Sequence, residues 1–90
     1  MTYVYQPSGV CSRKISIELE GSLIKSVEFT GGCHGNLQGV SRLVEGMTVE
    51  QAVGKIRGIR CGMKTTSCPD QLSKALTLAF EEEMKEQARA

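Results

Sequence analysis

The sequence predicts an α+β domain in which a small N-terminal antiparallel sheet packs against three helices. Residues 13–20, RKISIELE, alternate strictly between polar and apolar side chains, which is typical of a half-buried strand. Residues 23–30, LIKSVEFT, continue the apolar face after a turn that contains glycine, so the two segments predict a hairpin. Residues 2–6, TYVYQ, are aromatic and β-branched and predict a short edge strand. From Leu37 onward, apolar residues recur at helical spacing in three separate segments.

The register of the hairpin is predicted by keeping its apolar side chains on one face. A three-residue loop over 20–22 pairs Leu19 with Leu23 and holds that face together. A two-residue turn instead sets Ile15 opposite Glu28 and mixes the two faces. We therefore expect the three-residue loop.

The same register makes a prediction about two cysteines that lie just beyond the hairpin. It places position 11 opposite position 31, so Cys11 and Cys33 become near-diagonal neighbours. Such neighbours lie within about 8 Å of one another on an antiparallel ladder. The hairpin alone can therefore gather two thiols.

The three predicted helices begin and end at recognisable residues. Gly46 is suited to end the first helix. Thr48 is a predicted N-cap for the second, with Gln51 placed to complete a capping box. Cys68 is the predicted N-cap of the last helix, because Pro69 favours the first helical position. The predicted buried stripes are Leu37, Val40, Leu43 and Val44; Val49, Ala52, Val53 and Ile56; and Leu72, Leu76, Ala79, Phe80 and Met84.

Length and composition indicate one small domain over residues 1–90, with a thin core that is mostly aliphatic because aromatics make up only 4% of the chain. The formal net charge is +1, and neither sign is gathered in a block, so neither nucleic acid nor a charged membrane is an expected partner. The N-terminal residues lack the features of a signal peptide, and no apolar run approaches the ~18 residues of a spanning helix. We expect a cytoplasmic protein, and the composition leaves its oligomeric state open.

Four cysteines carry the chemistry that the sequence predicts. Structural disulfides are uncommon in the cytoplasm, so the thiols indicate metal or redox chemistry. Each cysteine falls in a loop or at the boundary of an element, whereas core cysteines would fall in register with the Ile and Leu positions. This pattern favours one convergent four-thiol site, holding either tetrahedral zinc or an iron–sulfur cluster. No CxxC pair occurs, so only the fold could assemble a site from Cys11, Cys33, Cys61 and Cys68.

The helix start at Cys68 is a favourable place for a negatively charged sulfur, because free N–H groups and the positive end of the helix dipole point there. An ordinary capping role for the thiol is the alternative. His34 is a ligand in place of one cysteine, a proton carrier or an exposed bystander. Five cations either cluster near the thiols or form ordinary surface: Arg13, Lys14, Arg57, Arg60 and Lys64.

The stretch TSCPDQL over 66–72, together with three upstream cysteines, resembles the TSCPD family. This family comprises small four-cysteine proteins and the C-terminal domain of adenosylcobalamin-dependent ribonucleotide reductases, and the resemblance covers essentially the whole chain. It implies an association with ribonucleotide reductase. The chain has no room for a nucleotide-binding barrel or a cobalamin site, so we expect no enzymatic activity of its own.

The order of motifs also resembles the iron–sulfur scaffold proteins of the IscU/NifU type. In both, a cysteine precedes a hairpin, a second lies in a glycine-rich turn into a helix, and a third begins a long final helix. This resemblance implies an IscU/NifU-like fold and matches Cys11, Cys33 and Cys68 to the three scaffold ligands. Arg13 stands where the scaffolds have an aspartate, and Cys61 has no counterpart, which favours a closed structural site.

Three functions follow from these patterns. The first is a four-cysteine metal-binding module, holding zinc, that serves as an accessory or interaction domain for ribonucleotide reductase or another protein. The second is an iron–sulfur cluster scaffold or carrier. The third is a thiol redox partner of a ribonucleotide reductase, which the absence of CxxC disfavours. A structural domain with four incidental thiols remains the plain alternative.

Overall fold

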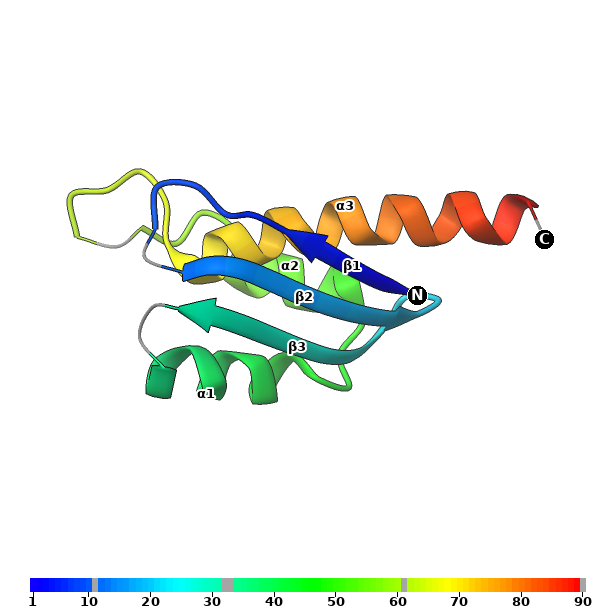
Figure 1. Cartoon of the computed structure of the whole chain (residues 1–90), viewed down its shortest axis with the longest axis horizontal. Helices are drawn as coiled ribbons and strands as arrows, with labels where there is room; N and C mark the ends of the chain where they lie inside the picture. Colours follow the sequence, from blue (N-terminus) through cyan, green and yellow to red (C-terminus); the bar gives the residue numbers. More distant parts are fainter. Residues whose placement is uncertain (11, 32–33, 61, 90) are drawn as a thin grey trace.

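The chain folds into a three-stranded antiparallel sheet and three helices (Figure 1). The structure is a computed structural model and describes residues 1–10, 12–31, 34–60 and 62–89. This arrangement confirms the predicted α+β class. The elements, in chain order, are β1 (Thr2–Tyr5), β2 (Ser12–Glu20), β3 (Leu23–Gly31), α1 (His34–Val44), α2 (Val49–Ile56) and α3 (Cys68–Arg89).

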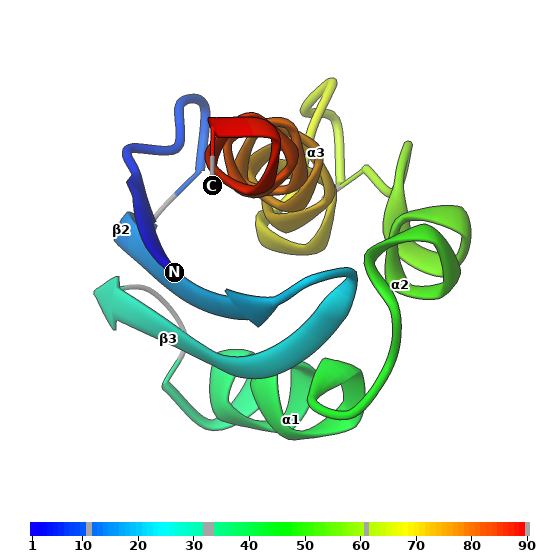
Figure 2. The ribbon, with the colours of Figure 1, turned by 90° about the vertical axis from the view of Figure 1, so that its right-hand side faces the viewer.

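The sheet has the order β1-β2-β3, so β1 is the edge strand that its sequence predicts. α3 packs against β1 and β2, α1 packs against β3, and α2 packs beside α3 (Figure 2). The apolar side of β2, formed by Ile15, Ile17 and Leu19, is almost fully buried in the single core cluster. The strict alternation of polar and apolar residues in β2 therefore correctly predicts which side of the strand faces the core.

The hairpin between β2 and β3 has a different register from the predicted one. Its turn is the two-residue one, because Glu20 pairs with Leu23. Leu19 therefore lies opposite Ile24, and a bulge at Lys25 then shifts the register by one residue, so that Ile17 lies opposite Val27. One extra residue on β3 reverses the mixing of faces that the two-residue turn would otherwise impose. The core is thus kept together by a bulge rather than by a longer loop.

A second irregularity lies at the far end of the same strand pair. Ser12 pairs with Gly31 and Lys14 pairs with Thr30, which leaves Arg13 as the extra residue on β2. Gly31 has a φ of +81°, and a Cβ there would come within 3.2 Å of Nε of Arg13. The positive φ favours glycine at this position, and a Cβ would in addition make the end of the Arg13 side chain shift by a few tenths of an ångström.

The first helix buries a different set of residues from the predicted stripe. Leu37 and Val44 are buried as expected, but Leu43 is 72% exposed and lines an apolar groove of about 300 Å³ between α1 and α2. At 3.6 residues per turn, or about 100° per residue, positions 41 and 44 lie within about 40° of position 37 around the helix axis, whereas position 43 lies about 120° away. Ser41 therefore takes the buried place, and its hydroxyl donates to the carbonyl oxygen of Leu37 at 2.9 Å.

The start of α2 confirms the predicted capping box. Thr48 Oγ accepts from the N–H of Gln51 at 3.2 Å, and Gln51 Oε1 accepts from the N–H of Thr48 at 3.1 Å. The same connection is bonded to the beginning of β3, since Ile24 N donates to the carbonyl oxygen of Met47 at 2.9 Å. Val49 and Ala52 are buried, so the helix faces the core as its stripe predicts.

The last helix contributes the middle of the core and then runs beyond the sheet (Figure 1). Leu72, Leu76 and Ala79 are fully buried, as predicted. Met84 is 37% exposed, and Glu83 is buried instead. The carboxylate of Glu83 lies beside the start of β1, where it is 3.5 Å from the amino group of Met1. The prediction that Met84 belongs to the buried face of this helix is therefore wrong.

Candidate functional site

The first turn of α3 contains the only cysteine among the described residues, Cys68. The helix begins one residue earlier than its sequence predicts. Ser67 is the cap, since its Oγ accepts from the N–H of Asp70 at 3.1 Å and its carbonyl accepts from the N–H of Gln71 at 2.8 Å. The hydroxyl is the better acceptor for a backbone N–H, so it takes the capping role and Cys68 becomes the first helical residue.

The sulfur of Cys68 lies against the beginning of the sheet. It is half-buried, and Ser12 Oγ lies 3.3 Å away, within hydrogen-bond distance. Ser12 is itself buried and pairs with Gly31, the last residue of β3. At this end of the hairpin, Ser12 follows Cys11 in the sequence and Gly31 lies two residues before Cys33. The same end meets the start of α3, which carries Cys68.

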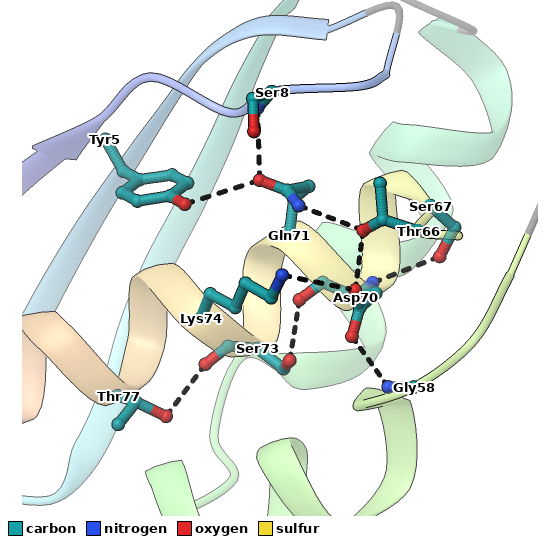
Figure 3. A network of polar contacts seen from close by, with 10 residues as sticks. All are labelled: Tyr5, Ser8, Gly58, Thr66, Ser67, Asp70, Gln71, Ser73, Lys74 and Thr77. Atoms are coloured by element: carbon teal, nitrogen blue, oxygen red, sulfur yellow. Dashed lines mark hydrogen bonds and ion pairs between the residues drawn. The ribbon is translucent and has the colours of Figure 1, made fainter. Parts of the chain in front are cut away.

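Asp70 forms a buried acceptor at the centre of a polar network (Figure 3). Its Oδ2 accepts from the hydroxyl of Thr66 at 2.5 Å, and its Oδ1 accepts from the backbone N–H of Gly58 at 2.6 Å. Lys74 Nζ lies 3.9 Å from Oδ2. The bonds from Thr66 and Gly58 and the charge of Lys74 hold the pKa of Asp70 below its usual value, although burial opposes them. The residue is therefore an ionised carboxylate that organises the loop before α3.

Gln71 extends the network to the N-terminal segment (Figure 3). Its Oε1 accepts from the hydroxyl of Tyr5 at 3.3 Å and from the backbone N–H of Ser8 at 3.1 Å. Its Nε2 donates to Thr66 Oγ at 2.9 Å, and the side chain is only 2% exposed. Gly9 has a φ of +72°, and a Cβ there would meet the methyl group of Thr66 at 3.1 Å. The segment after β1 therefore runs directly against the loop before α3.

Of the predicted metal ligands, the structure describes one, Cys68. The other three, Cys11, Cys33 and Cys61, lie outside the described residues, and so does the predicted proximity of Cys11 to Cys33. The described segments that flank them lie at one end of the long axis, together with the start of α3 (Figure 1). Within the described ranges, no group of three or more His, Cys, Asp or Glu side chains is placed to hold a metal ion.

The remaining predicted site residues are exposed or only partly described. His34 begins α1, and its side chain lies outside the described part of the chain. Arg13 lies against Gly31 at the end of the hairpin, next to Ser12. The other four predicted cations, Lys14, Arg57, Arg60 and Lys64, are exposed, and none of them forms an ion pair with a described residue.

Sequence reasoning missed the roles of Ser12, Tyr5 and Gln71 at this site. A serine beside a cysteine is common in loops and gives no indication that its hydroxyl will face another cysteine. Gln71 follows the predicted helix start, where a polar residue is expected to be solvated. A signal was present in the run from Thr66 to Asp70, whose polar residues precede an apolar stripe and suggest local side-chain bonding.

The fold and site define a small α+β domain whose last helix begins with a cysteine and is tied by buried polar side chains to two neighbouring loops. A family model described as the TSCPD domain matches residues 2–80, and the chain belongs to this family. No curated protein and no solved structure matches the chain. The IscU/NifU-like fold therefore stays a prediction from the order of motifs. In the part of the chain that the structure describes, no helix is long and apolar enough to cross a membrane.

Proposed function

We propose that this chain is a metal-binding accessory module in which four cysteines hold one zinc ion. The observation that supports the proposal most directly is that the described ends of three cysteine-bearing segments meet at the start of α3. Ser12 lies beside both Gly31 and the sulfur of Cys68, and Gly58 and Thr66 are bonded to Asp70. The proposed ligands are Cys11, Cys33, Cys61 and Cys68.

The chemistry of this donor set suits zinc. Four thiolates satisfy the tetrahedral preference of Zn²⁺ and leave no open position, which is the character of a structural site. A zinc ion bound there would link the hairpin, the loop before α3 and α3 itself, and would add to the stability of a small core. The hydroxyl of Ser12 is placed to donate to the sulfur of Cys68, which would stabilise its negative charge.

The first test is the metal content of untagged protein purified without oxygen, measured by elemental analysis together with a visible spectrum. We expect one zinc per chain and a colourless protein. Iron with broad absorbance near about 400 nm would instead indicate an iron–sulfur scaffold and would contradict the proposal. A folded protein without stoichiometric metal would contradict it as well, and would favour a thiol redox role.

Single substitutions test whether four thiols are used. Cys68→Ser and Cys61→Ser should each release zinc, because a closed site depends on every ligand. Thr65→Ser, at an exposed position of the same loop as Cys61, is the matched control and should retain the metal. If Cys61→Ser retains zinc and Cys68→Ser loses it, the site uses three thiols and Cys61 is not a ligand.

We further propose that the partner of the module is a ribonucleotide reductase in the cytoplasm. The support is membership of the TSCPD family, since the sequence resemblance to that family implies an association with the adenosylcobalamin-dependent members of this enzyme class. Isothermal titration of the zinc-loaded chain into a purified reductase of this class should show saturable binding. Absence of heat with the zinc-loaded chain, at concentrations up to about 100 μM, would leave no role for this partner.

A further inference from the structure

The two oxygens of one carboxylate hold both ends of the loop 58–66. Asp70 Oδ1 accepts from the N–H of Gly58 at one end, at 2.6 Å, and Oδ2 accepts from the hydroxyl of Thr66 at the other, at 2.5 Å. The carboxylate is buried, and bonds to an ionised acceptor are among the strongest that a loop can make. In sequence, this loop carries Cys61.

The segment 8–12 is held at both of its ends in the same way. The N–H of Ser8 donates to Oε1 of Gln71 at 3.1 Å, and Ser12 Oγ lies 3.3 Å from the sulfur of Cys68. In sequence, this segment carries Cys11. The first turn of α3 therefore holds two cysteine-bearing loops: Asp70 holds the loop 58–66, and Gln71 contacts both, because its Nε2 also donates to Thr66 Oγ at 2.9 Å.

We infer that Asp70 and Gln71 are positioning residues that preset these two loops for metal before it binds. The inference rests on the proposed function, because it assigns a role to residues around that site. Closing a loop costs conformational entropy, and a loop that is already closed by side-chain bonds does not require that cost from metal binding. Asp70 bonds only to the two ends of the loop that carries Cys61, whereas Gln71 bonds to that loop through Thr66 and to the other segment through Ser8.

This division of roles predicts a pattern that general destabilisation cannot produce. Asp70→Asn should weaken zinc binding by about tenfold to a hundredfold, the usual effect of removing a group that orients a ligand. In the Cys61→Ser background the same change should alter the affinity of the remaining three-thiol site by less than about twofold, because the ligand that Asp70 positions is gone. In the Cys11→Ser background it should keep its full effect.

Gln71 should show a different pattern, because it bonds to both loops. Gln71→Met keeps the length of the side chain but removes both hydrogen-bonding groups. It should weaken zinc binding in the wild-type background and keep part of its effect in both Cys61→Ser and Cys11→Ser, since each of these retains one of the two loops. Tyr5→Phe removes only the 3.3 Å bond to Gln71 and should give a smaller loss with the same dependence on background. It keeps this arm testable if Gln71→Met does not fold.

The affinities are measured by competition between the protein and a colorimetric zinc chelator under reducing conditions. Leu76→Ala is the control for loss of stability, because this residue is fully buried further along α3 and its apolar side chain makes no hydrogen bond to either loop. Its effect on zinc binding should be the same in all cysteine backgrounds. Asp70→Asn should differ from it by its selectivity.

Hydrogen exchange gives a readout that does not involve metal. In metal-free protein, Asp70→Asn should speed the exchange of the Gly58 amide and leave that of Ser8 unchanged, because only the former donates to the carboxylate. Gln71→Met should speed the exchange of the Ser8 amide, which loses its acceptor. Exchange that is unchanged at both amides would show that the loops are not preset and would overturn the inference.

The failures of the two proposals are distinguishable. If wild-type protein holds no zinc, the proposed function fails and the positioning role fails with it. If wild-type protein holds zinc but Asp70→Asn weakens binding equally in every cysteine background, the zinc site stands and the positioning role is wrong. Selective coupling of Asp70 to Cys61 supports both.

Discussion

Replacing Asp70 by asparagine should destabilise the metal-free protein by about 2 kcal/mol. The carboxylate is 7% exposed and accepts two short hydrogen bonds, from Gly58 N at 2.6 Å and from Thr66 Oγ at 2.5 Å. An asparagine keeps one carbonyl acceptor for one of these donors, and its NH₂ group leaves the other without an acceptor. A hydrogen bond to a charged group contributes about 1.5–3 kcal/mol, and the substitution removes one and weakens the other.

A loss of this size is readily measured in a domain of ninety residues. At typical stabilities per residue, the whole domain has about 5–13 kcal/mol, and 2 kcal/mol lowers the Tm by about 8–16 °C. Thermal unfolding followed by circular dichroism, with EDTA and a reductant present, gives the value. Glu82→Gln makes the same chemical change at an exposed site, where Lys85 lies 3.5 Å away, and should cost less than about 0.5 kcal/mol. A loss for Asp70→Asn no larger than that of the control would refute the reasoning.

The same carboxylate predicts a dependence on pH. The bonds from Thr66 and Gly58 hold its folded-state pKa below the unfolded value, so the ionised group stabilises the folded protein above that value. This contribution is lost as the pH falls through the folded pKa. The difference in stability between wild type and Asp70→Asn should therefore be constant above about pH 5 and shrink below about pH 4. Urea denaturation across this range measures it, and a difference that persists unchanged at pH 2 would contradict the assignment.

Two further predictions concern the fold. Thr48→Ala removes the side-chain half of the capping box on α2 and should cost about 1 kcal/mol in urea denaturation, whereas Thr48→Ser should retain most of the stability. A loss of equal size for both variants would assign the effect to the methyl group instead. Leu76→Ala should cost about 2–5 kcal/mol, because the side chain is 0% exposed, while Leu43→Ala, at 72% exposed, should cost less than about 0.5 kcal/mol in thermal unfolding. Equal losses at the two leucines would contradict the core described for α1.

Local patterns predicted most of the secondary structure, because they depend on interactions between residues that are close in sequence. The alternation over 13–20 identifies β2, and the capping pair Thr48 and Gln51 fixes the start of α2 through bonds within one turn. The cap of α3 is Ser67, one residue before the predicted cap Cys68. Both residues fit a helix start, and only the hydrogen bond from the N–H of Asp70 to Ser67 Oγ distinguishes them. Family membership was also available from the sequence, in the run from 66 to 70.

The site depends on contacts that no local pattern contains. The sequence by itself determined the strands, the helices and a cysteine at the beginning of α3. Only the tertiary structure decided that a bulge at Lys25 sets the hairpin register, that Ser12 reaches Cys68, and that Gln71 turns inward. Gln71 and Ser8 are 63 positions apart in the chain, so their bond forms only after β1 and α3 have packed together. Burial then makes the bond necessary, since an amide removed from water without a partner would destabilise the fold.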